Sequence, residues 1–139
     1  MKLAPLLILP LALLAGGAGK PDASIAHGRL GQTLDLGRLR VTPLRVIEDS
    51  RCPVQVSCVW AGRLRLLARI QSGHHRHNQE LTLGVPATVA GGKLELLTAV
   101  PRPSRQGAAA PGAYRFGLRF RADARPAPRL QTVAATPTV

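Results

Sequence analysis

Apolar and polar residues alternate with a period of two along several short stretches of this chain. In residues 113–121 one parity is aromatic or aliphatic and the other is largely arginine, and residues 63–70 show the same pattern. Alternation of this kind is typical of a strand with one buried face. Residues 63–70 also suit a helix by composition, but the turns that flank them lie close together and favour a strand.

Further β-like stretches are separated by Gly- and Pro-containing turns. They are residues 30–36, 38–48, 79–83 and 93–100. Pro43, inside the second stretch, indicates an edge position or a bulge. The fold predicted is all-β, a small antiparallel β-sandwich or barrel-like domain.

The ends of the chain differ in composition from this β-rich middle. Residues 1–19 combine Lys2, an apolar run at 5–15 and small residues at 15–19, the pattern of a cleaved signal peptide. The run is shorter than the roughly 20 residues that span a bilayer. A retained anchor is the alternative. We expect a periplasmic or secreted protein with no transmembrane segment in its mature form.

The domain boundaries follow from these patterns. We expect a flexible lead-in over residues 20–29, the β-sandwich domain over 30–121, and a disordered Ala/Pro/Arg-rich tail over 122–139.

Both cysteines lie in a charged segment, residues 48–62, that also holds the only tryptophan. In an oxidising compartment Cys52 and Cys58 most simply pair, and the chain-entropy model gives such a ring roughly 2.4 kcal/mol of stabilisation. A free-thiol nucleophile is the alternative. We expect a stapled turn, with Trp60 laid over the disulfide as a core anchor and Arg51 paired with Glu48 or Asp49.

The same segment is also a candidate recognition site, because rigidly held loops often carry function. The side chains that would form the site are Glu48, Asp49, Ser50, Arg51 and Trp60. A catalytic Ser50 would need a histidine and a carboxylate nearby in space.

The motif E-D-S-R-C-P followed by C-V-W-A-G, at residues 48–53 and 58–62, resembles that of a family of small, uncharacterised exported bacterial proteins. The resemblance implies a β-rich domain from about residue 30 to 121. It also implies a paired-cysteine turn between two strands.

The charge balance favours anionic partners. The formal net charge is +12 at pH 7, with sixteen arginines and three lysines. We expect six arginines to share one sheet face as an anion-binding surface: Arg63, Arg65, Arg69, Arg115, Arg119 and Arg121. An anionic envelope lipid or glycan is the expected partner. Nucleic acid is disfavoured, since aromatic residues are too few for a stacking platform.

No catalytic or phosphate-loop motif appears, so we expect a non-enzymatic protein without a cofactor. The alternative is an exported metal-binding protein that uses the polar turn with His74, His75 and His77. A four-ligand zinc site that joins Cys52 and Cys58 to His74 and His77 has poor spacing for such a site.

Overall fold

The computed structural model describes residues 24–123 of the chain. The expected signal peptide and nearly all of the expected tail therefore lie outside the described residues. The elements are β1 (Ile25–Gly28), β2 (Leu34–Asp35), β3 (Arg40–Asp49), β4 (Leu64–Ser72), β5 (His75–Thr82), β6 (Ala87–Val89), β7 (Gly92–Val100), the 3₁₀ turn η1 (Pro111–Ala113) and β8 (Arg115–Ala122).

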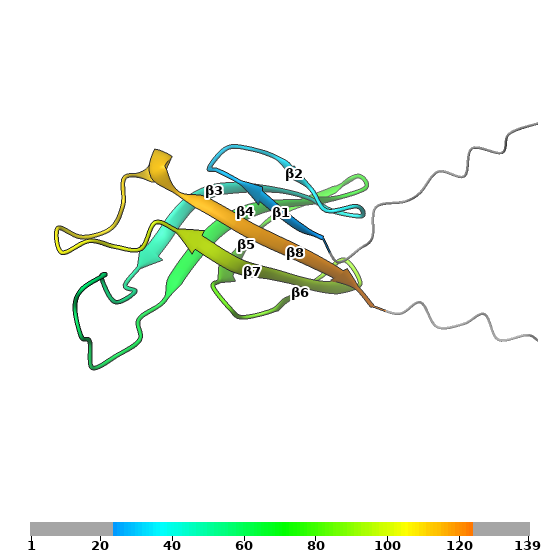
Figure 1. Ribbon diagram of the computed structural model, residues 1–139. Coiled ribbons are helices and arrows are strands. Elements are labelled where there is room, and N and C mark those ends of the chain that lie inside the picture. The colour runs from blue at the N-terminus through cyan, green and yellow to red at the C-terminus, as the bar shows by residue number, and fades with distance from the viewer. Residues whose placement is uncertain (1–23, 124–139) are drawn as a thin grey trace, which may run out of the picture.

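These strands form two four-stranded sheets, in the orders β1-β8-β7-β6 and β2-β3-β4-β5. Every pairing between the named strands is antiparallel. The two sheets pack face to face, and the β3–β4 loop and the β7–β8 loop project from the same end (Figure 1). The prediction of an all-β sandwich is confirmed. Within residues 24–123, no helix has the length and apolarity needed to cross a membrane.

The core lies between the sheets and follows the alternation read from the sequence. Leu64, Leu66, Ala68 and Ile70 of β4 are fully buried, as are the inward residues of β8, and one continuous cluster joins the two sets. Each fully buried large aliphatic or aromatic side chain contributes roughly 1.5–3 kcal/mol relative to exposure. The period of two in residues 63–70 therefore marks a strand and not a helix.

The lead-in expected over residues 20–29 is not flexible throughout, because β1 occupies part of it. β1 pairs with β8, placing Ala26 opposite Leu118 and Gly28 opposite Phe116. A Cβ atom on Gly28 would come within 2.5 Å of Leu34 Cδ2, so a larger residue there would displace the Leu34 side chain. Its four residues, IAHG, carry too little alternation to predict a strand.

The strand β3 is irregular. Its register with β4 shifts between Pro43 and Arg45 and again between Val46 and Glu48. β2 pairs only with the first two residues of β3, so the rest of β3 is an edge of its sheet. The proline therefore lies at both a bulge and an edge, as its missing N–H predicts. The long edge strand leads directly into the cysteine loop.

Candidate functional site

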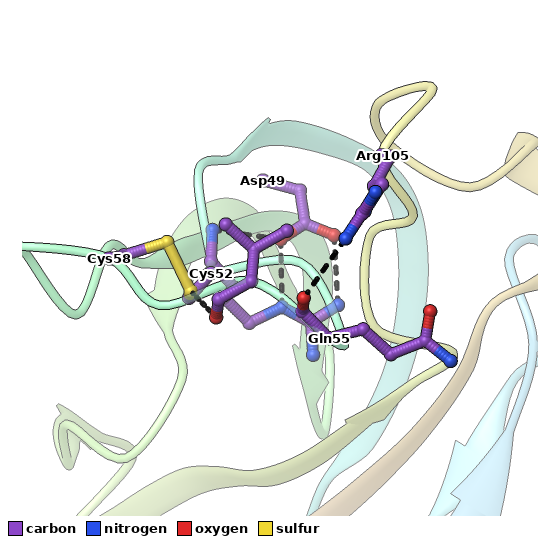
Figure 2. The surroundings of a disulfide bond; sticks show 7 residues. Asp49, Cys52, Gln55, Cys58 and Arg105 are labelled. Atoms are coloured by element: carbon purple, nitrogen blue, oxygen red, sulfur yellow. Dashed lines mark hydrogen bonds and ion pairs between the residues drawn. A yellow bond between two sulfur atoms is a disulfide. The ribbon is translucent and has the colours of Figure 1, made fainter.

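The loop between β3 and β4 is closed by a disulfide between Cys52 and Cys58, whose Cα atoms lie 5.9 Å apart (Figure 2). The predicted disulfide is confirmed. Because both sulfur atoms are used in this bond, they are not free to bind zinc. The four-ligand site with His74 and His77 is therefore ruled out.

The loop is attached to the sandwich through a buried ion pair. Arg51, with 8% of its surface exposed, directs Nε to Asp49 Oδ1 at 2.7 Å and Nη2 to Asp49 Oδ2 at 2.8 Å. Nη1 donates to the Ala99 carbonyl oxygen and Nη2 also donates to that of Pro101, at the end of β7. The Tyr114 hydroxyl donates to Asp49 Oδ2 at 2.7 Å. One guanidinium thus connects the two sheets beneath the loop.

The electrostatics of this cluster favour the ionised pair. Burial raises the pKa of Asp49, but the hydrogen bonds from Arg51 and Tyr114 outweigh it and hold the pKa below its usual value. Burial, together with the hydrogen bond to Asp49, raises the pKa of the Tyr114 hydroxyl. At neutral pH Asp49 is therefore a carboxylate and Tyr114 a neutral donor, as the observed bonds require.

A second set of contacts closes the base of the loop. The Ser50 hydroxyl lies 2.9 Å from Glu48 Oε1 and 3.2 Å from the Arg63 carbonyl oxygen, while the Arg63 N–H donates back to Ser50 Oγ at 3.1 Å. The hydrogen bond from Ser50 is the largest cause that lowers the pKa of Glu48. Ser50 therefore fixes the loop base through the Glu48 carboxylate and the Arg63 backbone, and none of these contacts is with a histidine.

Gly62 completes the loop base. Its φ is +64°, and a Cβ atom there would lie 1.8 Å from the Ser50 carbonyl oxygen. The Gly62 backbone therefore lies directly against the Ser50 backbone, which leaves no room for a side chain at residue 62.

The prediction that Trp60 anchors the core is wrong. Its side chain is 82% exposed, and the neighbouring Val59 is 90% exposed. The place beneath the loop where an anchor would sit is filled by Arg51, whose carboxylate and carbonyl partners make a charged side chain tolerable there. The buried position is thus occupied by Arg51, with its many hydrogen bonds, and not by the aromatic side chain of Trp60.

The prediction that six arginines share one face is also wrong. Arg65 and Arg69 lie on β4 and Arg63 directly precedes it, whereas the other three lie on β8, in the opposite sheet. Acidic residues are interleaved as well: Arg63 Nε lies 3.0 Å from Glu48 Oε2, Arg65 pairs with Glu80, and Arg119 pairs with Glu95. Parity within a strand does not reveal which sheet the strand joins or what faces it from the next strand.

The structure instead gathers a different set of arginines. Arg40, Arg69 and Arg76, from the neighbouring strands β3, β4 and β5, line a hollow of about 210 Å³. The other lining residues are polar and uncharged: Thr33, Thr42 and Gln71. We call this set the arginine cluster. Of these three, the sequence predicts only Arg69 in an anion site. Arg40 and Arg76 join it through the strand register, which the sequence pattern does not reveal.

The histidine turn is an exposed β-hairpin end. His74 lies in the turn, and His75 and His77 lie on β5, with all three side chains exposed. Among residues 24–123, no group of three or more His, Cys, Asp or Glu side chains is arranged to hold a metal ion. Weak metal binding by these histidines alone stays a prediction.

The fold and its sites define a small β-sandwich domain with a disulfide-stapled loop and an exposed arginine cluster. Comparison with protein-family models, with curated proteins and with solved structures finds no match to the chain.

Proposed function

We propose that this chain is an exported, non-enzymatic binding domain that attaches to an anionic component of the cell envelope through the arginine cluster. The observation that carries the proposal is the convergence of three guanidinium groups, from three adjacent strands, on one hollow without a carboxylate among its lining residues.

The strand register explains the convergence. Arg40 lies opposite Gln71, which lies opposite Arg76, and Arg69 occupies the next row, opposite Thr42. Like charges this close on one sheet face destabilise each other. Asp35 is the cross-strand partner of Arg40, but its Oδ1 accepts the Gly37 N–H at 2.9 Å. A bound anion would offset the repulsion that remains.

The chemistry of the lining selects the ligand class. Guanidinium groups bind phosphate and carboxylate oxygens in a bidentate manner, and the threonine hydroxyls and the glutamine amide add neutral donors. A hollow of about 210 Å³ is smaller than the ~300–1,000 Å³ typical of drug-sized ligands. It suits a single phosphate or carboxylate group of a larger molecule. We therefore propose a phosphorylated or acidic envelope glycan as the ligand.

Export is part of this proposal. The signal-like segment at residues 1–19 and the disulfide, a bond that persists in oxidising compartments, both support it.

The test uses de-acylated lipopolysaccharide, which carries phosphates on a soluble glycan and has no acyl chains. Replacing Arg40, Arg69 and Arg76 together by Gln should weaken binding about tenfold or more, and added salt should weaken binding by the unaltered protein. A triple variant with the same change in net charge, Arg115→Gln, Arg119→Gln and Arg121→Gln, serves as the control on the opposite sheet. Equal weakening by both triples, or binding indifferent to salt, would show that the cluster is not the site.

A further inference from the structure

The cysteine loop ends in an apolar tip. From residue 52 to residue 62 the chain carries no charged side chain, although its formal net charge is +12. Four apolar side chains in this run are exposed, with exposed fractions of 48% for Val54, 41% for Val56, 90% for Val59 and 82% for Trp60. We call residues 52–62 the tip. Exposed apolar side chains gathered on one loop are typical of an interaction surface.

Exposed arginines stand beside the tip. The β7–β8 loop packs against the cysteine ring, where the Val54 N–H donates to the Pro103 carbonyl oxygen at 3.2 Å and Arg105 Nη2 lies 3.4 Å from the Gln55 carbonyl oxygen (Figure 2). Arg105 and its neighbour Arg102 are exposed, and neither forms an ion pair with a carboxylate of residues 24–123. An uncharged apolar tip is thus flanked by free positive charge.

The tip is held in place before any partner arrives. The disulfide closes the ring, Arg51 ties it to both sheets, and the Gly62 backbone lies against Ser50. Preorganisation of this kind reduces the ordering cost of binding.

We propose that the tip inserts into the interface of an anionic lipid bilayer. Trp60 and Val59 enter the headgroup region, and Arg102 and Arg105 approach lipid phosphates. Tryptophan prefers this region because its ring is apolar while its indole N–H needs a polar partner. Basic side chains near an anionic leaflet add further attraction.

The tip and the proposed glycan site share no residues. The tip connects the end of β3 to the start of β4, whereas the arginine cluster lies at the start of β3 and toward the end of β4. Either site can therefore fail its test without affecting the other.

Trp60 is the only tryptophan in the chain, so its emission reports directly on the tip. The protein is recovered from an exporting host, with its N-terminus determined by mass spectrometry, and mixed with phosphatidylglycerol vesicles that carry no glycan. We expect emission to move to shorter wavelength and to be quenched by lipids brominated on their acyl chains. Quenching needs no variant and so does not depend on the stability of an altered chain.

Variants complete the test through co-sedimentation with the same vesicles. Trp60→Ala should weaken vesicle binding about tenfold or more, and Val85→Ala, at an apolar residue 54% exposed outside the tip, should change it less than about twofold. Binding without an emission shift, or binding unaffected by Trp60→Ala, would overturn the proposal. A shift produced by soluble envelope proteins but not by protein-free vesicles would overturn it in favour of a protein partner.

Discussion

Replacing Arg51 by Met tests whether the buried ion pair holds the cysteine loop to the sandwich. The substitution keeps a side chain of similar length but removes both hydrogen bonds to Asp49 and the bonds to the Ala99 and Pro101 carbonyl oxygens. Asp49 would remain buried with only the Tyr114 hydroxyl as a side-chain donor.

Breaking a buried pair on one side costs about 3–5 kcal/mol, because the other charge is left without compensation. We expect about 3 kcal/mol for Arg51→Met, the lower end of that range, since the Met side chain still packs and Tyr114 still donates to Asp49. For a domain of about 100 residues this corresponds to a fall in Tm of roughly 12–24 °C.

The assay is equilibrium unfolding in urea with the disulfide intact. The control is Arg65→Met, which removes solvent-accessible ion pairs with Glu80 and Glu48. The control should lose far less stability, because solvent screens exposed pairs. Tyr114→Phe is a milder variant of the same cluster, and it should lose stability in the same direction. A loss from Arg51→Met no larger than that from Arg65→Met would refute the reasoning.

The pH dependence of the same unfolding measurement tests whether Asp49 is the charged partner of Arg51. The pKa of Asp49 is lowered in the folded state, so its contribution is present above its unfolded value near 4 and is lost as the pH falls through the lowered folded value. The stability difference between the unaltered protein and Arg51→Met should therefore be largest near neutral pH and shrink below about pH 4. A difference that grows on acidification would contradict the assignment of Asp49 as the charged partner.

Two further predictions concern the loop itself. Gly62→Ala should destabilise the fold by at least about 2 kcal/mol, roughly twice the cost of Gly73→Ala. Both glycines have positive φ, but only at Gly62 would a Cβ atom meet backbone. Thermal unfolding of the two variants measures this ratio, and equal losses of stability would contradict the prediction. Cys52→Ser combined with Cys58→Ser should cost at most about 2.4 kcal/mol in urea unfolding and leave the far-ultraviolet spectrum of the sheets unchanged, because the seven-residue ring lies outside the core. Loss of the β spectrum in that double variant would show that the ring supports the sandwich and not only the tip.

The sequence predicts the features that depend on one strand at a time. Leu64, Leu66, Ala68 and Ile70 bury one parity of β4 as alternation requires, and Pro43 lies at a bulge on an edge. Pairing of Cys52 with Cys58 also follows locally, since six positions separate them and no other cysteine competes.

The predictions that were wrong depend on what lies across a strand or beneath a loop. The arginine cluster arises because β3, β4 and β5 align Arg40, Arg69 and Arg76 side by side, and one residue of register would remove it. The apolar ring of Trp60 predicts a buried anchor at that residue. The buried site beneath the loop instead holds Arg51, because Asp49 and the end of β7 provide its hydrogen-bond acceptors. Long-range partners of this kind leave no mark in local sequence.

The distance between the two proposed sites supports a glycan as the ligand of the arginine cluster. At the loop base Asp49 pairs with Leu64, and in the arginine cluster Gln71 pairs with both Arg40 and Arg76. Leu64 and Gln71 are seven residues apart along β4, which at about 3.3 Å per residue is roughly 23 Å. We propose that the domain stands with β4 along the bilayer normal and its tip in the interface, which would hold the arginine cluster well above the lipid phosphates. An anionic group carried on a glycan chain that extends from the surface would reach that height, which agrees with the ligand we propose. The rigid attachment of the loop through Arg51 matters for this reason, because it keeps the two sites at a fixed separation.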